Sequence, residues 1–334
     1  MHKTLFHFSC IAGLLCCGIF SISWGIWGHQ HINRAAVFAL PDSMRVFFFN
    51  HIDYLTEEAA VPDLRKYVIG DRAEPDRHYI DLEEFGAHPF DSLPETWDAA
   101  VRKYGEKKLH QAGILPWYIQ QMEQKLEQAF RNRRTDEILF IAADLGHYIA
   151  DAHVPLHTTV NHDGQLTGQR GIHAFWESQL PELFGADYNF HVASARYIPD
   201  VQAEVWKIIR HTHQLVDTTL LVEKRLLETF PKDRIYRTDA QGHTLKNAYG
   251  QPMFSYAFAE AYHKALHGMV EDQMRKAIQA LADFWYTAWV NAGRPNLMAL
   301  DDPSLTQANQ KIYKKAYRLY QQGKLWGIRS GNEY

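Results

Sequence analysis

The chain has 334 residues, 46% of them hydrophobic, which is enough for one or two domains with a sizeable core. Its formal net charge is −4 at pH 7, which argues against a broad basic surface for nucleic acids. This charge still allows a small site in which metal ions supply the positive charge, and the 19 histidines are many for a chain of this length.

The first 23 residues are predicted to be a secretory signal peptide. An apolar run covers 5–20, and Ser21 and Ser23 are small residues at the positions that a signal peptidase reads, so cleavage is expected before Trp24. The mature domain would be 24–334, and we expect it to be periplasmic or secreted. All three cysteines lie inside the signal peptide, so the mature chain must be held by its core, by metals or by both. No later apolar run is long enough to span a bilayer, so no transmembrane segment is expected.

The rest of the chain reads as helices separated by turns. Apolar periodicity, caps and prolines predict helices over 29–40, 44–52, 94–104, 112–133, 136–153, 172–183, 200–229, 254–291 and 305–322. Asp42 and Ser43 are expected to cap the second of these. Residues 57–77 are expected to be irregular, 158–171 to form a loop beside a metal site, and 231–252 to make a hairpin excursion. No repeat or composition shift marks a boundary, so we predict one all-α domain with a metal site in a cleft between helices.

The strongest chemical signal lies at the end of the 136–153 helix. His147 and Asp151 are four residues apart and share one helix face, Pro155 should stop the helix, and His157 follows in the turn. A second pair with the same spacing consists of His173 and the acid four residues later. One such pair is usually a surface or capping pair. Two pairs around a proline turn favour a metal, and nitrogen and oxygen donors without thiolate suit zinc or a harder divalent ion.

The candidate ligands follow one another in a recognisable order. They form the opening Trp24-Gly-x-x-Gly-His29, Asp63 followed by His78-Tyr79-Ile-Asp81, His147-x3-Asp151-x5-His157, and His173-x3-Glu177. In these positions the chain resembles the superfamily of zinc-dependent phospholipases C and single-strand-specific zinc nucleases. Each motif is weak alone, but together they begin at the predicted cleavage site and keep the order of the superfamily.

The resemblance implies three zinc ions in one cleft. The first would be held by Asp63, His78, His147 and Asp151, the second by His157, His173 and Glu177, and the third by the amine and carbonyl of Trp24 with His29 and Asp151. Asp151 would thus bridge the first and third ions. The amine of Trp24 could bind a metal only after the signal peptide is removed. The reference pKa of an α-amine, about 8, allows it to lose a proton to a metal.

The expected reaction is hydrolysis of a phosphate ester. Two zinc ions sharing a water would lower its pKa from about 15.7 to about 7, and the zinc-bound hydroxide would attack phosphorus. The third ion would stabilise the leaving oxygen. The resemblance implies that Asp63 orients the nucleophile or accepts its proton, so Asp63 and the bridging Asp151 are the predicted catalytic residues.

Two classes of substrate, phospholipids and single-stranded nucleic acids, fit these residues. Glu177 resembles the phospholipases, because the nucleases usually have Asp there, whereas the tryptophan-containing opening resembles the nucleases. In the nucleases the positions of Tyr79 and Asp81 contact a base, and an Arg contacts the phosphate where this chain has Lys66, which cannot make a bidentate contact. We favour a phospholipase C-type enzyme, with Lys66, Tyr79 and Asp81 as substrate-binding residues. The alternatives are a single-strand-specific endonuclease and 3′-nucleotidase, which would form no stable nucleic-acid complex, and an inactive metal-binding structural protein.

Other histidines have simpler explanations. His31 and His153 lie next to predicted ligands but off their helix faces, so we expect them to pack behind the site. His263 and His267 are four residues apart but have no acidic partner in the sequence pattern, and we expect a plain helix surface.

Overall fold

The protein is described here by a computed structural model, which covers residues 25–247 and 250–325. The predicted signal peptide and Trp24 lie outside these ranges. Within them the regular structure is helical, and pairing between extended segments is limited to isolated antiparallel bridges, so the all-α prediction is confirmed. None of the described helices is both long and apolar enough to cross a membrane.

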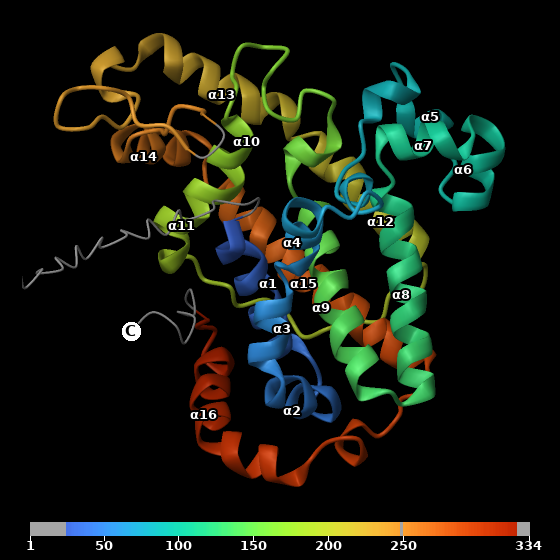
Figure 1. Cartoon of the computed structure of the whole chain (residues 1–334). Coiled ribbons are helices and arrows are strands. Elements are labelled where there is room, and N and C mark those ends of the chain that lie inside the picture. The colour runs from blue at the N-terminus through green and yellow to red at the C-terminus, as the bar shows by residue number, and fades with distance from the viewer. Residues whose placement is uncertain (1–24, 248–249, 326–334) are drawn as a thin grey trace, which may run out of the picture.

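The helices follow one another with short connections (Figure 1). The α-helices are α1 (Gly25–Ala39), α2 (Asp42–Asn50), α3 (Ile52–Glu58), α4 (Val61–Leu64), α5 (Pro89–Ser92), α6 (Trp97–Tyr104), α7 (Glu106–Ala112), α8 (Leu115–Asn132), α9 (Thr135–Asp151), α10 (Ile172–Ala174), α11 (Leu180–Phe184), α12 (Val201–His213), α13 (Val216–Thr229), α14 (Tyr256–Ala265), α15 (Met269–Asn291) and α16 (Pro303–Gln321). Two π-helical segments occupy Arg65–Ile69 and Phe175–Gln179. Short 3-10 helices occupy Pro75–Arg77, Leu82–Phe85, Pro155–Thr158, Gly185–Asp187, Lys232–Arg234 and Leu297–Ala299.

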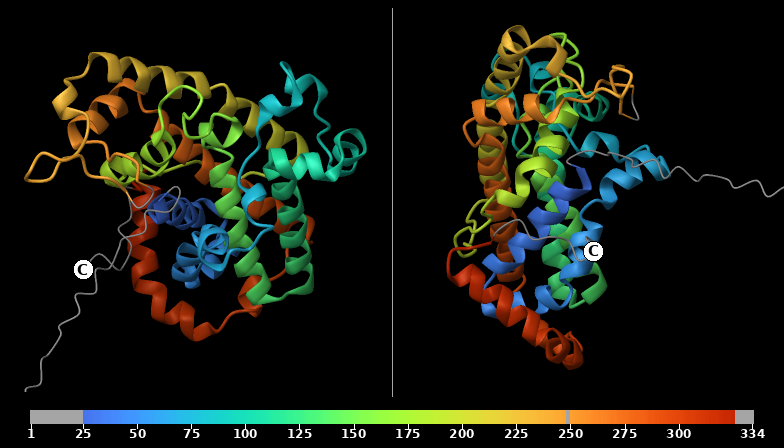
Figure 2. Two further views of the ribbon diagram at one scale, coloured as in Figure 1. Left: turned by 45° about the horizontal axis from the view of Figure 1, so that its top comes forward. Right: turned by 90° about the vertical axis from the view of Figure 1, so that its left-hand side faces the viewer.

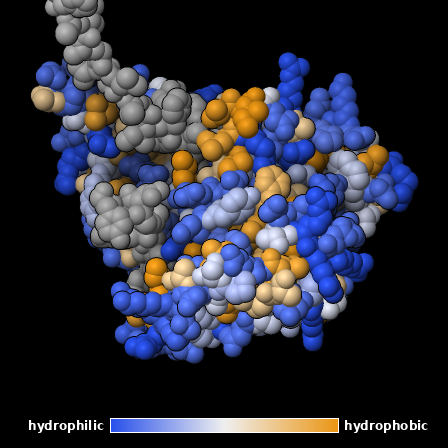
Figure 3. All heavy atoms as spheres, turned by 60° about the horizontal axis from the view of Figure 1, so that its bottom comes forward, coloured by the Kyte–Doolittle hydropathy of each residue, from blue (hydrophilic) through white to orange (hydrophobic). Residues whose placement is uncertain are grey.

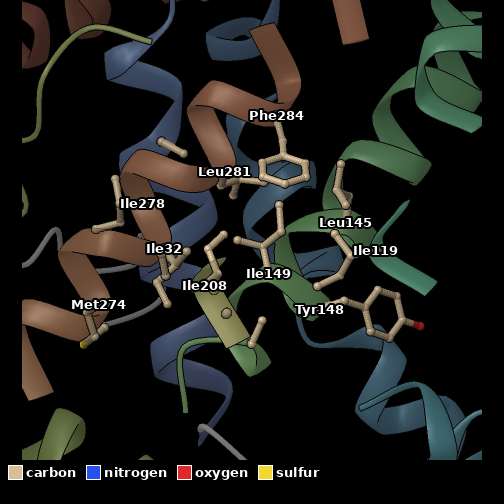
Figure 4. Close-up of a cluster of buried hydrophobic side chains, with 14 of the residues drawn as sticks. Ile32, Ile119, Leu145, Tyr148, Ile149, Ile208, Met274, Ile278, Leu281 and Phe284 are labelled. Atoms are coloured by element: carbon tan, nitrogen blue, oxygen red, sulfur yellow. The ribbon is translucent and has the colours of Figure 1, made fainter. Parts of the chain in front are cut away.

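The core is built around α9. Leu145 and Ile149 of this helix point toward Ile32 of α1, Ile119 of α8 and Leu281 of α15, and all five side chains are buried (Figure 4). Burying one such side chain stabilises the fold by about 1.5–3 kcal/mol, so α9 is held firmly by its apolar face. Its other faces are then free to carry polar side chains inside the molecule.

The remaining helices surround this core at opposite ends. α13, α14 and the 231–252 excursion lie at one end of the molecule, and α16 lies at the other, where it packs against α2 (Figures 1 and 2). The excursion pairs Tyr236 with Phe254 and Thr238 with Thr244 through antiparallel bridges. This agrees with the predicted hairpin.

Three predicted boundaries are wrong for physical reasons. Asp42 and Ser43 do not cap α2; Pro41 precedes the helix, and no side-chain cap is formed. The stretch 57–77 is largely helical, because α3, α4 and a π-helical segment follow one another there. The long run 254–291 is interrupted between α14 and α15, where His267 and Gly268 adopt φ angles of 50° and 82° that a helix cannot contain.

The predicted 200–229 helix is also interrupted. α12 ends at His213 and α13 begins at Val216, so the apolar periodicity continues across a turn. Periodicity alone could not reveal this break, because no proline or glycine marks it in the sequence.

Candidate metal centre

Several separate elements bring imidazoles and carboxylates to one place. The predicted ligands among the described residues are His29 on α1, Asp63 on α4, His78 after the 3-10 helix Pro75–Arg77, His147 and Asp151 on α9, His157 on the 3-10 helix Pro155–Thr158, His173 on α10 and Glu177 on the following π-helical segment. All of them are buried except His173, which is partly exposed. Trp24, the remaining predicted ligand, lies outside the described residues.

The first cluster is formed by Asp63, His78, His147 and Asp151, which we call the inner group. Nδ1 of His78 and Nε2 of His147 lie 3.0 Å and 3.3 Å from Oδ2 of Asp151, and 3.1 Å from each other. Oδ1 of Asp63 lies 3.7 Å and 3.9 Å from the same two nitrogens. Four donor atoms from three parts of the chain therefore converge on one point.

The second cluster is formed by His157, His173 and Glu177, which we call the mouth group. Nε2 of His157 lies 3.3 Å from Oε1 of Glu177, and Nε2 of His173 lies 2.6 Å from Oε2. The side chain of His173 is 22% exposed, whereas that of Glu177 is fully buried. The mouth group therefore opens to solvent through His173.

Asp151 lies between the clusters and His29. Its Oδ2 faces the inner group, whereas Oδ1 lies 3.7 Å from Nε2 of His29 and 4.0 Å from Nε2 of His157. This Oδ1 atom is buried and accepts no hydrogen bond from the described part of the chain. The ring of His29 stacks on that of His147 with 3.8 Å between centroids, and His29, His147 and Asp151 form a third set of possible ligands. The predicted third group of Trp24, His29 and Asp151 therefore includes His147 as a close neighbour.

Three imidazoles are oriented by backbone carbonyls. Nδ1 lies 2.8 Å from the carbonyl oxygen of Ala59 for His147, 2.5 Å from that of His78 for His157, and 3.0 Å from that of His162 for His173. A carbonyl only accepts hydrogen bonds, so Nδ1 must carry the proton in each ring. The Nε2 lone pair then faces its cluster, which is the arrangement of a neutral histidine that binds a metal.

His78 is oriented by a carboxylate that the sequence analysis missed. Its Nε2 lies 3.4 Å from Oε1 of Glu74, whose side chain is fully buried. Arg65 and Arg77 donate to Oε2 of Glu74 over 3.0 Å and 2.9 Å, and the hydroxyl of Tyr148 donates to Oε1. Burial alone would raise the pKa of Glu74, but the nearby imidazole of His78, the hydroxyl of Tyr148 and the charge of Arg65 hold it well below its usual range. The spacing of four residues between Glu74 and His78 was the available signal.

The buried carboxylates of both clusters attract positive charge. Burial opposes ionisation of Asp151, but His147 and His157 outweigh it and lower the pKa of this carboxyl well below its usual range. Burial lowers the pKa of His157, but Glu177 and Asp151 outweigh this effect and raise it to about 9. Positive charge beside these carboxylates is therefore favourable, and metal ions could replace the imidazole protons in that role.

Of the three predicted substrate residues, Lys66 contacts the inner group. Nζ of Lys66 lies 3.4 Å from Oδ1 of Asp63, at the edge of this group. Tyr79 follows His78 directly, and its hydroxyl is 3.4 Å from the carbonyl oxygen of Gln111.

Asp81 is the third predicted substrate residue. Its backbone N–H donates to the carbonyl of Ala112 over 2.7 Å. Burial, reinforced by the charges of Glu83 and Glu84, raises the pKa of its carboxyl to about 6. Asp81 is therefore a half-buried carboxyl that titrates close to neutral pH.

The predicted loop at the site, 158–171, consists of turns and is held by three acidic residues, of which Glu83 and Glu223 lie outside it. Glu83 accepts hydrogen bonds from the hydroxyl of Thr159 and the N–H of Val160. Asp163 accepts from the N–H of Gly171 and from Gln251, and Glu223 accepts from Gln169 at 2.6 Å. Since the carbonyl of His162 orients His173, these contacts support the mouth group.

The other histidines differ from one another. His31 stacks on Trp27, and His153, just beyond the end of α9, hydrogen-bonds to the carbonyl of Ile149; both side chains are buried, as expected. His263 is not a plain surface residue. Its Nε2 lies 2.7 Å from the hydroxyl of Tyr188, and its ring stacks on Phe184, because α11 and α14 pack together.

The donor set fits a divalent metal. It consists of imidazole nitrogens and carboxylate oxygens, it is buried, and its imidazoles are oriented by groups behind them. Comparisons with protein-family models, with curated proteins and with solved structures find no match to this chain. The chemistry of the centre is therefore inferred from its own residues.

Proposed function

We propose that this chain is a zinc-dependent phosphodiesterase of the phospholipase C type, with the fold of the phospholipase C and zinc nuclease superfamily. The observation that carries the proposal is the position of Asp151. Its two oxygens face different nitrogen donors, with Oδ2 toward the inner group and Oδ1 toward His29 and the mouth group. A buried carboxylate with donors on both sides is suited to bridging metal ions.

The residues that would hold zinc are those that match the ligand positions of the phospholipase C and zinc nuclease superfamily. The inner group would hold one ion, the mouth group a second, and His29 with Asp151 and the terminus at Trp24 a third. Zinc bound there would act as a Lewis acid toward a phosphate oxygen and would lower the pKa of water. We also propose export of the protein, on the basis of the signal-like sequence of residues 1–23.

The chain itself would position the substrate and handle the proton. Asp63 lies at the edge of the inner group, where its carboxylate can orient a water molecule and accept its proton. Lys66 lies beside Asp63 and can contact a phosphate oxygen as a point charge. Asp151 would hold the inner group and His29 at a fixed distance from each other.

An exposed apolar pair favours a lipid substrate. Val68 and Ile69 follow Lys66 in the same π-helical segment and are 71% and 73% exposed. Apolar side chains close to a phosphate-binding cation fit the headgroup and glycerol region of a phospholipid. Glu177 in the mouth group, where the nucleases usually have Asp, points the same way.

A nuclease is the second candidate, and Tyr79 is the observation in its favour. Tyr79 directly follows the predicted ligand His78 in the chain and is half-buried. Such a ring can stack on a nucleobase.

The test is a parallel assay of zinc-loaded mature protein, 24–334. The substrates are phosphatidylcholine vesicles, single-stranded DNA and the soluble diester bis(p-nitrophenyl) phosphate, with Asp151→Asn as the inactive control. We expect release of phosphocholine and hydrolysis of the soluble diester. Cleavage of DNA alone would replace the lipase by the nuclease. A protein that binds zinc but cleaves none of the three substrates would be a structural metal protein.

A further inference from the structure

The end of the chain differs in charge from the rest. Residues 303–325 contain five Lys and Arg side chains and no Asp or Glu, whereas the rest of the chain has 39 acidic and 30 basic residues. The five cations are Lys311, Lys314, Lys315, Arg318 and Lys324, and all are exposed. Within the described residues none of them pairs with a carboxylate.

Three lysines on other helices, in contrast, are paired with acidic residues. Lys207, Lys264 and Lys276 each form an ion pair with an acidic residue three or four positions earlier in the same helix, over 3.0, 3.0 and 2.6 Å. Such pairs neutralise the local field. On α16 the field is left unbalanced, so this helix presents positive charge to solvent.

Beside these cations, α16 also carries exposed apolar residues. Ile312 and Leu319 are 63% and 45% exposed, and they lie seven positions apart, so they share one helix face. Lys311, Lys315 and Arg318 form the adjacent row by the same spacing rule. We call these five residues the basic face of α16.

The packing of α16 uses another set of residues. The hydroxyl of Tyr313 accepts a hydrogen bond from Arg45 of α2 over 3.0 Å, and the Arg45 guanidinium lies 3.7 Å from the ring centre of Tyr317. Tyr320 donates to the carbonyl of Val192 over 2.9 Å. Ile312 and Leu319 are therefore not needed to hold the helix in place.

An apolar groove continues from the basic face toward α1 and α2. It has a volume of about 250 Å³, and Phe38 and Phe49 line it together with Ile312 and Leu319. Lys324 also borders it. In Figure 3 the face of the molecule that carries α2 and α16 is mostly hydrophilic, with apolar side chains emerging between polar ones.

We propose that the basic face of α16 docks on an anionic lipid bilayer. Apolar side chains flanked by lysine and arginine match the boundary between acyl chains and anionic headgroups, because the chains bury the apolar atoms and the headgroups attract the cations. A nucleic acid would use the cations but would leave Ile312 and Leu319 without apolar contacts. The proposal goes beyond hydrolysis and does not depend on it, since none of these residues belongs to the metal centre.

The experiment is vesicle co-sedimentation of the mature protein. The probes are vesicles of phosphatidylcholine alone and of phosphatidylcholine mixed with phosphatidylglycerol, at low and high salt. The variants are Lys311→Glu with Lys315→Glu, and Ile312→Ser with Leu319→Ser. The control with matched charge is Lys224→Glu with Arg225→Glu on exposed positions of α13.

We expect much stronger co-sedimentation with the anionic vesicles than with phosphatidylcholine alone, and loss of this difference at high salt. One Lys or Arg near an anionic surface contributes about fivefold to partitioning, so the double charge reversal on α16 should weaken binding at least about tenfold. The serine variant should weaken it several-fold, and the α13 control should bind within about twofold of wild type. Hydrolysis of bis(p-nitrophenyl) phosphate should be the same for all variants as for wild type.

Three results would overturn the proposal. The first is equal binding by wild type and the α16 charge-reversal variant, and the second is no binding by wild type. The third is a gel shift of single-stranded DNA that depends on Lys311 and Lys315 while vesicles do not bind. If vesicles bind as expected but the soluble diester is not hydrolysed by any protein, the phosphodiesterase proposal fails and lipid docking stands.

Discussion

The inner and mouth groups contain the same kinds of ligand, but they are supported differently. In the inner group, His147 is held by α9 within the core, and His78 is held by the buried charge of Glu74. In the mouth group, His173 is held by the carbonyl of His162, which lies in a loop of turns. One group is fixed by packed helices and an ionic network, and the other by a surface loop.

This difference predicts a difference in metal retention. Loops open locally at a lower free energy than core helices, so ligands held by a loop leave a metal more readily. We therefore expect a chelator to remove the ion of the mouth group first. The predictions below test that ranking, from the largest expected effect to the smallest.

Asp151→Asn should have the largest effect. The substitution removes the carboxylate charge that faces both the inner group and His29, so activity should fall by at least about a thousandfold and more than one zinc ion should be lost. Elemental analysis and circular dichroism should accompany the assay, since loss of a ligand can unfold the site. A folded variant that keeps its zinc and much of its activity would show that Asp151 is not a bridge.

His173→Ala should act on the mouth group alone. We expect loss of one zinc ion, retention of the inner ion, and a fall in activity of about a hundredfold, which is smaller than for Asp151→Asn. Metal content per chain is the deciding measurement. Loss of all ions from a folded protein would show that the two groups are not separable.

Glu74→Gln should weaken the inner group without removing a ligand. The neutral side chain keeps its shape but no longer places a charge beside Nε2 of His78, so zinc affinity should fall by about 10–100-fold. Competition with a chromophoric chelator measures this, and the cobalt-substituted protein should show a shifted absorption spectrum. Glu123→Gln, another buried glutamate, is the control and should change neither. An unchanged affinity would reduce Glu74 to a purely structural role.

Glu223→Gln should give the smallest effect, on stability. Burial raises the pKa of this carboxyl from 4.5 to about 7, although a hydrogen bond from Gln169 opposes the shift. Folding therefore favours the protonated form, and the stability it contributes is fully present below pH 4.5 and is lost as the pH rises to about 7. At pH 8 the glutamine variant should be more stable than wild type by about 1–3 kcal/mol.

Urea unfolding at pH 5 and pH 8 measures this difference. Glu228→Gln, an exposed position on the same helix, is the control and should follow wild type at both pH values. A glutamine variant of Glu223 that loses stability at pH 8 would mean that the charged form is held by a partner.

Much of the helical pattern could be predicted from the sequence, and the reason is periodicity. The helix carrying His147 and Asp151 was expected over 136–153 and is found at Thr135–Asp151, because its apolar residues repeat with the period of a helix. The π-helical segment Arg65–Ile69 could not be predicted, since a widened turn changes the hydrogen bonding without changing the residue types.

The residues that converge at the candidate centre could also be predicted, but the groups that orient them could not. Side chains such as Asp63 and Glu177 are visible as residue types at a fixed spacing. The carbonyls of Ala59 and His162 that orient two of the rings have no sequence signature, because every residue has a carbonyl. Only the fold decides which carbonyl lies behind which ring.

His78 contacts both the inner group and the mouth group. Its ring belongs to the inner group, its carbonyl accepts from Nδ1 of His157, and the N–H of Ile80 donates in turn to the carbonyl of His157 over 2.9 Å. A metal ion that holds the ring of His78 in place would therefore also hold the backbone carbonyl that orients His157. We therefore expect metal binding at the inner group and at the mouth group to be coupled, and reciprocity requires that each ion change the affinity for the other by the same factor. A metal titration of the apoprotein should accordingly be cooperative, with the inner group binding its ion first and thereby favouring metal binding by the mouth group.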